Sequence, residues 1–80
     1  MRVVKSKQVI KFIEKQNPQT QERLNIAINN LPNGDIVPIA GLADTFRLRI
    51  GGFRAVFVKE PDIIKVTYLD TRGQIYKHGG

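Results

Sequence analysis

Two adjacent glycines, Gly51-Gly52, are the feature that most constrains the fold of this chain. They stand between two segments, residues 46–50 and 53–58, in which apolar residues alternate with others as in strands that bury one face. A glycine pair between such segments predicts a β-hairpin with a two-residue turn. The turn length sets the register of the two strands, and the register decides which side chains meet across the hairpin.

The expected register divides the hairpin into an apolar face and a basic face. With a two-residue turn, Ile50 faces Phe53 and Arg49 faces Arg54. The apolar face is a candidate core and collects Phe46, Leu48, Ile50, Phe53, Ala55 and Phe57. The other face collects Arg47, Arg49 and Arg54 beside Val56 and Val58. Opposed like charges destabilise a strand pair by roughly 0.2–1 kcal/mol, so the arginines indicate either an anion site or an ordinary solvated face.

The first part of the chain predicts two helices. Ser6 can cap a helix that runs to about Gln16, and Asn17-Pro18 then ends this helix and begins another. The second helix stops before residues 32–34, and its apolar residues have the spacing of a buried face: Leu24, Ala27, Ile28 and Leu31. Together the two helices form a predicted helical hairpin.

The second part of the chain predicts strands. Residues 36–42 read as a connector broken by proline and glycine, and residues 2–4 can form an edge strand. Beyond the hairpin, strands are expected at residues 63–69 and 74–77, after turns at residues 60–62 and 71–73. The order predicts an α+β fold in one domain over residues 1–80, with an N-terminal helical hairpin packed on one face of a small, mainly antiparallel β-sheet.

The charge of the chain favours an anionic partner. Thirteen Lys and Arg against seven Asp and Glu give a formal net charge of +6 and an isoelectric point near 10.1. Without cysteine and with the single histidine His78, a metal site or a Cys–His or Ser–His hydrolase is poorly supported, so we expect no metal and no cofactor. No signal segment or membrane span is recognisable, and the expected location is the cytoplasm.

Three segments of the chain together form one characteristic sequence pattern. Ile39-Ala40-Gly41-Leu42 is a connector, and residues 46–57 form an aromatic-basic-apolar-basic strand, a glycine turn, and then an aromatic-arginine and apolar strand. Residues 68–77, YLDTRGQIYK, close the chain with an arginine and a tyrosine. This pattern resembles that of RelE/ParE-superfamily toxins, the small basic toxins of bacterial type II toxin–antitoxin pairs. The resemblance extends over essentially the whole chain and is to the RelE-like members.

The resemblance to RelE-like toxins implies a metal-independent, ribosome-dependent endoribonuclease that cuts mRNA and inhibits translation. Carried over by position, the catalytic candidates are Arg47 and Arg49 in the first hairpin strand, Arg54 after the turn, and the closing pair Arg72 and Tyr76. Arg54 and Arg72 are expected to hold the scissile phosphate, and Arg47 and Arg49 to position the backbone and stabilise charge. Arginine is a poor proton donor or acceptor, so Tyr76 is the titratable candidate and the general acid and base stay unassigned.

Alternatives stay open for single residues and for the whole chain. Tyr76 can be an edge-strand aromatic and Arg72 a turn residue, and Asp44 and Asp70 read as turn or cap residues. The chain can also be a ParE-like inhibitor of DNA gyrase without nuclease activity, or a degenerate member that only binds its antitoxin or RNA. The expected partners are a cognate acidic antitoxin with the ribosome and mRNA, or DNA gyrase in the alternative, and no membrane.

Overall fold

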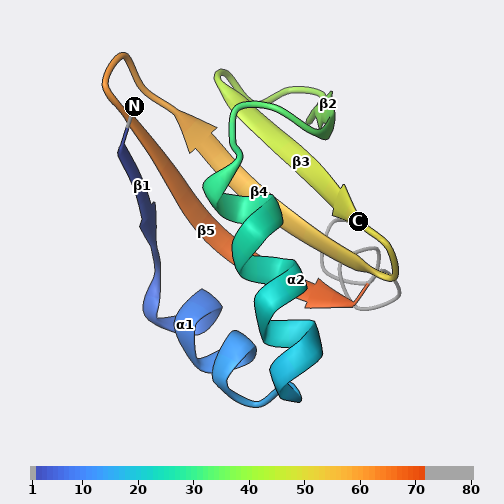
Figure 1. The fold of residues 1–80 in the computed structure, drawn as a ribbon. Coiled ribbons are helices and arrows are strands. Elements are labelled where there is room, and N and C mark those ends of the chain that lie inside the picture. The colour runs from blue at the N-terminus through green and yellow to red at the C-terminus, as the bar shows by residue number, and fades with distance from the viewer. Residues whose placement is uncertain (1, 72–80) are drawn as a thin grey trace.

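The computed structural model describes residues 2–71, which form an α+β fold with two helices and one mixed five-stranded sheet (Figure 1). In chain order the elements are β1 (Arg2–Lys5), α1 (Lys7–Glu14), α2 (Pro18–Asn29), β2 (Asp35–Pro38), β3 (Thr45–Ile50), β4 (Phe53–Lys59) and β5 (Ile63–Thr71). The strand order across the sheet is β1-β5-β4-β3-β2. β1 pairs with β5 in parallel, and the other neighbouring strands pair antiparallel.

Both helices begin at the predicted caps. The side-chain oxygens of Ser6 and Asn17 accept the backbone N–H three residues later, at 3.2 and 2.8 Å. The helices end at Glu14 and Asn29, slightly before the predicted ends. Beyond each end, a backbone N–H bonds to the carbonyl three residues back, which closes a turn instead of extending the α-helix.

Ser6 also ties the start of α1 to β5. Its backbone N–H donates to the carbonyl of Val66, and its hydroxyl donates to the carbonyl of Thr67, both at 3.0 Å. The junction between β1 and α1 is therefore attached to β5, the strand with which β1 pairs. The predicted edge strand at residues 2–4 is confirmed as β1.

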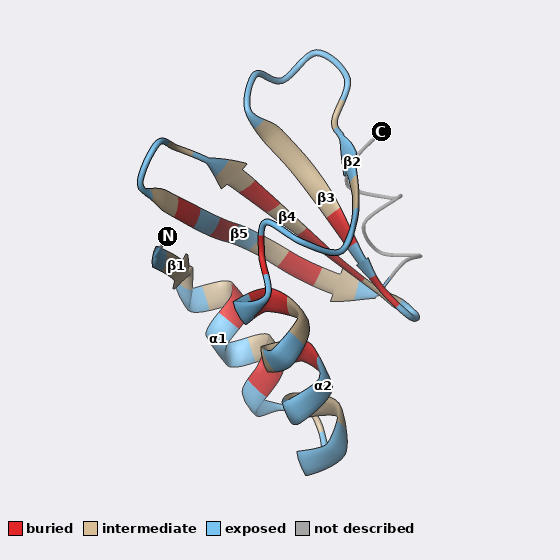
Figure 2. Ribbon diagram, turned by 45° about the horizontal axis from the view of Figure 1, so that its top comes forward, coloured by how far each residue is buried: buried red, intermediate tan, exposed pale blue. Residues whose placement is uncertain are grey.

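The buried apolar residues lie between the helices and the sheet. Figure 2 shows both helices on one side of the sheet, with buried residues on their near sides and at alternate positions of the central strands. The core consists of Val9, Ile13, Leu24, Ile28, Leu31, Leu48, Ile50, Ala55, Phe57, Ile64, Val66 and Leu69. Neither of the two described helices is long and apolar enough to cross a membrane.

The β3–β4 hairpin has the predicted register. Ile50 pairs with Phe53 across the two-glycine turn, and Arg49 pairs with Arg54. The apolar face predicted for this hairpin is the face that contributes to the core. Further from the turn, the paired Phe46 and Phe57 stack with ring centroids 5.5 Å apart.

The connector predicted at residues 36–42 was wrong in part, because Asp35–Pro38 forms the edge strand β2. Asp35 lies opposite Arg49 in the ladder with β3. Pro38 is the last residue of this edge strand, where proline is tolerated because its missing N–H removes no internal ladder bond. Four residues with only Ile36 partly buried are too short a segment to show the alternation that identifies a strand.

β5 contains a β-bulge that the sequence did not predict. Val66 and Tyr68 pair with consecutive residues of β4, so Thr67 between them is the extra residue. The bulge allows Val66 and Leu69 both to be buried in the core. It also places Tyr68 and Asp70 on the face away from the helices, in register with residues of β4 that point the same way.

The end of β5 differs from the prediction as well. The strand runs to Thr71 instead of Leu69, so Asp70 is a strand residue and not the turn or cap residue expected. The predicted strand at residues 74–77, together with Arg72 and Tyr76, lies outside the described residues.

Replacing Gly51 by alanine should lower the stability of the protein, whereas replacing Gly52 should not. Gly51 has a φ of +57°, and an added Cβ would also meet the guanidinium of Arg23. A Cβ on Gly52 would meet nothing within 4 Å. We expect Gly51→Ala to reduce the free energy of unfolding by about 1–2 kcal/mol in urea denaturation, and Gly52→Ala by less than about 0.5 kcal/mol. Equal losses in both variants would contradict this assignment of the turn.

Candidate functional site

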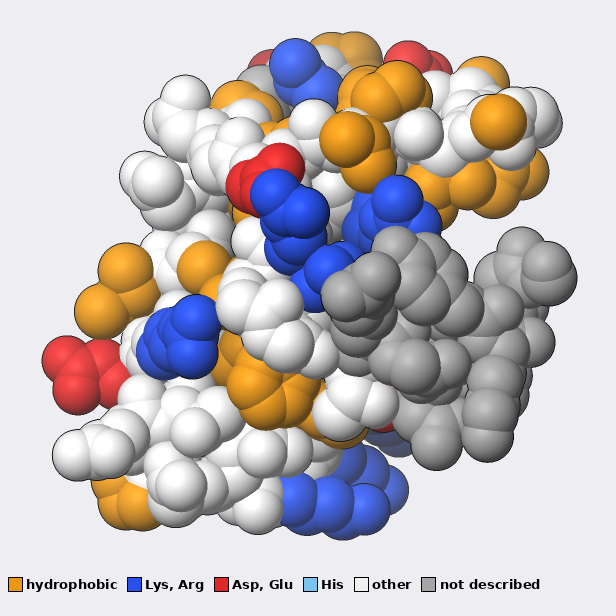
Figure 3. All heavy atoms as spheres, turned by 90° about the vertical axis from the view of Figure 1, so that its right-hand side faces the viewer, with side chains coloured by type: hydrophobic (Ala, Val, Ile, Leu, Met, Phe, Trp, Pro, Cys, Tyr) orange, Lys and Arg blue, Asp and Glu red, His pale blue; other side chains and the backbone are white. Residues whose placement is uncertain are grey.

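Three arginines lie around one hollow on the sheet face away from the helices, which we call the arginine face. Arg47 and Arg49 from β3 and Arg54 from β4 line this hollow, whose volume is about 150 Å³, together with Asp35 and Val37 from β2. In Figure 3, basic side chains gather on this side of the molecule, and an acidic side chain lies against them. The structure therefore brings together the three described members of the predicted site.

Charged residues form a row across four strands of the arginine face. Asp35, Arg49, Arg54 and Asp70 are successive partners in the ladders β2–β3, β3–β4 and β4–β5. The opposed arginines in the middle of the row were predicted from the turn, but the aspartates at its ends were not. The ion pair of Arg49 with Asp35 offsets part of the repulsion between the arginines, and Asp70 lies directly opposite Arg54 in the β4–β5 ladder.

Arg49 is the exposed arginine of the three. Its Nε and Nη2 both lie 2.5 Å from Oδ2 of Asp35, and the two side chains are 60% and 49% exposed. Arg47, two residues earlier in β3, is half-buried. An exposed ion pair of this kind contributes about 0–1 kcal/mol to stability, so it can be broken by a competing anion.

Arg54 is the buried arginine of the three and supports the hairpin turn. Its side chain is almost covered, with 5% of the residue exposed. Its Nη1 donates to the carbonyls of Gly51 and Phe53, both at 2.8 Å. These bonds commit one nitrogen of Arg54 to the turn, a structural role that sequence analysis did not foresee beside the expected contact with phosphate.

Tyr68 and Asp70 form a hydrogen-bonded pair on the arginine face that sequence analysis missed. The Tyr68 hydroxyl donates to Oδ2 of Asp70 at 2.9 Å, and the backbone N–H of Thr71 donates to Oδ1 at 2.7 Å. The bond to Asp70 raises the pKa of Tyr68 above its ordinary value of 10.0, and burial and the carboxylate charge act in the same direction. The bond and the nearby carboxylate thus favour the protonated form of this phenol.

The sequence carried only an indirect signal for Tyr68. In a regular strand, a tyrosine two residues after the buried Val66 would also face the core. The bulge at Thr67 reverses that expectation. The position of Asp70 directly opposite Arg54 could likewise have been predicted only once the register of β4 against β5 was known.

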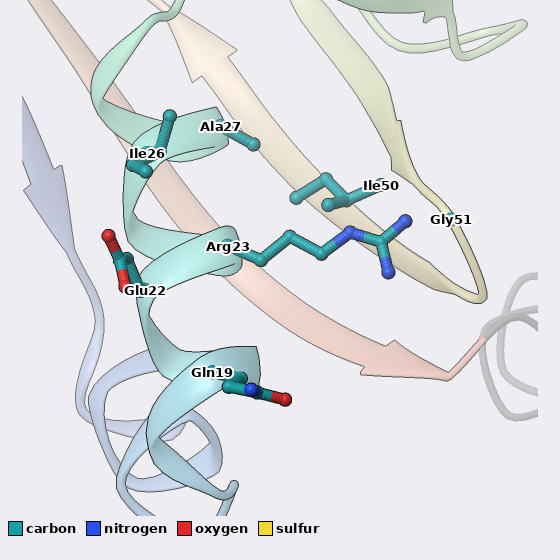
Figure 4. A pocket seen from close by; sticks show the side chains of 7 residues that line it. All are labelled: Gln19, Glu22, Arg23, Ile26, Ala27, Ile50 and Gly51. Carbon is teal, nitrogen blue, oxygen red and sulfur yellow. The ribbon is translucent and has the colours of Figure 1, made fainter.

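A larger hollow lies on the helix side of the hairpin, between α2 and the turn (Figure 4). Its volume is about 560 Å³, and Arg23 extends across it toward Gly51, near Ile50. This hollow is lined by one guanidinium, whereas three guanidiniums line the smaller one, so the smaller one is the better anion site. Within residues 2–71, no three acidic or histidine side chains come together in a way that could hold a metal ion.

Comparison with solved structures finds the same fold in two toxin–antitoxin complexes. A chain of a RelB–RelE antitoxin–toxin complex from Methanococcus jannaschii superposes with a TM-score of 0.75 at 22% identity, over 94% of this chain and 96% of that one. A chain of an archaeal RelE–RelB complex from Pyrococcus horikoshii OT3 gives 0.72 at 25% identity, over 91% of this chain and 96% of that one. No protein-family model matches the sequence, and no curated protein matches it. Both organisms are archaea, whereas the sequence resemblance was to toxins of bacterial toxin–antitoxin pairs.

The pKa of Tyr68 should be measurable and should depend on Asp70. Tyr76→Phe leaves Tyr68 as the only tyrosine, so absorbance of the phenolate reports its titration alone. We expect its pKa to lie above 10.0, and an added Asp70→Asn substitution to lower it toward that value. Because the folded-state pKa is the higher one, the stability that this bond contributes is present below about pH 10 and is lost as pH rises through the folded-state pKa. An unchanged titration after Asp70→Asn would contradict the assignment.

Proposed function

We propose that this chain is the toxin of a toxin–antitoxin pair and that it is a metal-independent endoribonuclease that cuts mRNA on the ribosome. The observation that carries the proposal is the convergence of Arg47, Arg49 and Arg54 on one hollow of the arginine face. The likeness to chains of two RelB–RelE complexes supports a toxin–antitoxin setting. In this proposal residues 1–80 are one RelE-like toxin domain, whose two helices form the hairpin expected from the sequence.

Of the two partners in such a complex, the toxin RelE fits this chain better than the antitoxin RelB. The reason lies in the arginine face, since phosphate-binding guanidiniums serve RNA cleavage and have no evident use in a protein that neutralises a basic toxin. The formal net charge of +6 agrees with an acidic antitoxin as the cognate partner. We propose that acidic side chains of this antitoxin lie over the arginine face, with an affinity that falls as salt screens the charges.

The proposed reaction is attack of a ribose 2′-oxygen on the adjacent phosphorus. The new O2′–P bond forms as the P–O5′ bond breaks, the 2′-hydroxyl loses its proton, and the 5′-oxygen gains one. Negative charge grows on the phosphoryl oxygens in the transition state, and guanidiniums held in place by the sheet stabilise it. Arg47 and Arg49 position the backbone and stabilise charge, Arg54 and Arg72 hold the scissile phosphate, and Tyr76 stacks on a base or assists proton transfer.

A translation reaction with mapping of mRNA 3′ ends tests the proposed activity. We expect purified protein to stop translation and to produce cuts at fixed positions within codons on ribosome-bound mRNA. Double-strand DNA breaks with intact mRNA would instead indicate the ParE-like gyrase inhibitor. Growth arrest must follow expression of this chain alone. If the chain instead relieves the arrest caused by a neighbouring gene product, it is the antitoxin.

Single alanine variants test which residues perform the reaction. Loss of one preorganised charge donor typically reduces the rate by about 10²–10³, so Arg49→Ala, Arg47→Ala and Arg72→Ala should each lower mRNA cleavage by that factor. Lys65→Ala is the matched control, because it removes an equal charge from an exposed position whose ion pair is with Glu60. Circular dichroism shows whether each variant is folded. Arg54→Ala is less suitable, because it also removes two hydrogen bonds from the turn. Folded arginine variants that cleave like the Lys65→Ala control would place the active site elsewhere.

A further inference from the structure

Asp35 holds the exposed guanidinium of the arginine face. Nε and Nη2 of Arg49 both contact Oδ2 of Asp35. A carboxylate and a phosphate present similar oxygens to a guanidinium, and they use the same paired N–H groups. The Nε–Nη2 edge of Arg49, one of the two edges through which a guanidinium can bind a phosphodiester, is therefore already taken by a side chain of the same protein.

We propose that Asp35 is an intramolecular competitor for phosphate at Arg49. The proposal rests on the proposed function in one respect, namely that the arginine face binds an RNA backbone. An incoming phosphodiester must displace the Asp35 carboxylate before it can bind Arg49 through this edge. Asp35 therefore lowers the affinity of the arginine face for polyanions and reduces the dependence of that affinity on salt.

The positions of the two residues suit such an exchange. Asp35 lies opposite Arg49 in the β2–β3 ladder, so the backbone keeps the carboxylate beside the guanidinium even when their bond is broken. Both side chains are about half exposed or more, and exposed ion pairs exchange readily because water solvates the separated charges. Asp70, at the other end of the charged row, is held differently, since its oxygens accept bonds from Tyr68 and Thr71.

The test compares Asp35→Asn with Glu60→Gln. Glu60 forms the second exposed ion pair within residues 2–71, with Lys65, so both substitutions break one exposed pair and raise the formal charge of +6 by one. The probes are a single-stranded RNA with 2′-O-methyl groups, which the proposed reaction cannot cleave, and a short inorganic polyphosphate. Affinity is measured by fluorescence anisotropy, with competition for polyphosphate, over a series of salt concentrations.

We expect Asp35→Asn to tighten RNA binding about threefold to tenfold at low salt and Glu60→Gln less than about twofold. One added phosphate contact should also steepen the slope of log K against log salt by roughly 0.7 for Asp35→Asn alone. Equal effects of the two variants, or no effect of Asp35→Asn, would overturn the proposal. If the parent protein binds polyphosphate but not RNA, and Asp35→Asn strengthens that binding, the competition by Asp35 stands and the proposed function fails.

A second pair of variants separates competition from a change in folding. In an Arg49→Gln background the guanidinium is absent, so Asp35→Asn should have no larger effect than Glu60→Gln has there. Circular dichroism and urea denaturation report whether β2 and the rest of the fold are kept in each variant. A tightening by Asp35→Asn that persists without Arg49 would show that Asp35 acts only as one negative charge among others, and the proposal would be wrong.

Discussion

The register of β3 against β4 is the constraint on which both the core and the arginine face depend. The two-glycine turn sets this register, and side chains alternate between the two faces along each strand. A slip of one residue would turn Arg47 and Arg49 toward the helices and the apolar side chains toward water. Burying guanidiniums without partners costs several kcal/mol each, which a small domain cannot sustain. The stability of the core therefore enforces the placement of the arginines.

The arginine face places two arginines directly opposite each other, and one of them is exposed to solvent and can bind an anion. Arg49 and Arg54 repel each other across the hairpin, and the ion pair of Arg49 with Asp35 offsets part of that repulsion. The two arginines differ in exposure and in their partners. Arg49 is exposed and paired with Asp35, whereas Arg54 is buried and donates hydrogen bonds to the turn. The face thus contains one rigid guanidinium and one that can change partner, which suits a site that must both position and release an anion.

The hairpin, both helix caps and most of the core could be predicted from the sequence because each depends on local patterns. Glycine at the turn, Ser6 and Asn17 at the caps, and alternation in β3 and β4 act within a few residues. The strand β2 and the bulge at Thr67 depend instead on pairing with distant residues, and their segments show no periodic signal. The candidate site was predicted in its three described arginines. Asp35 was missed because its partner Arg49 comes from another strand, and Tyr68 was missed because the bulge at Thr67 decides which face it lies on.

The attachment of β1 to β5 joins the two ends of the described chain. β1 and the cap of α1 come first in the chain, yet the backbone groups they bond to in the sheet belong to β5, the last described element. The β3–β4 hairpin forms between neighbouring segments, whereas the edge formed by β1 needs a distant partner. The β1–β5 pair therefore closes a loop of about 60 residues, and pairing the first described strand with the last carries the largest loop-closure entropy of any strand pair in this sheet.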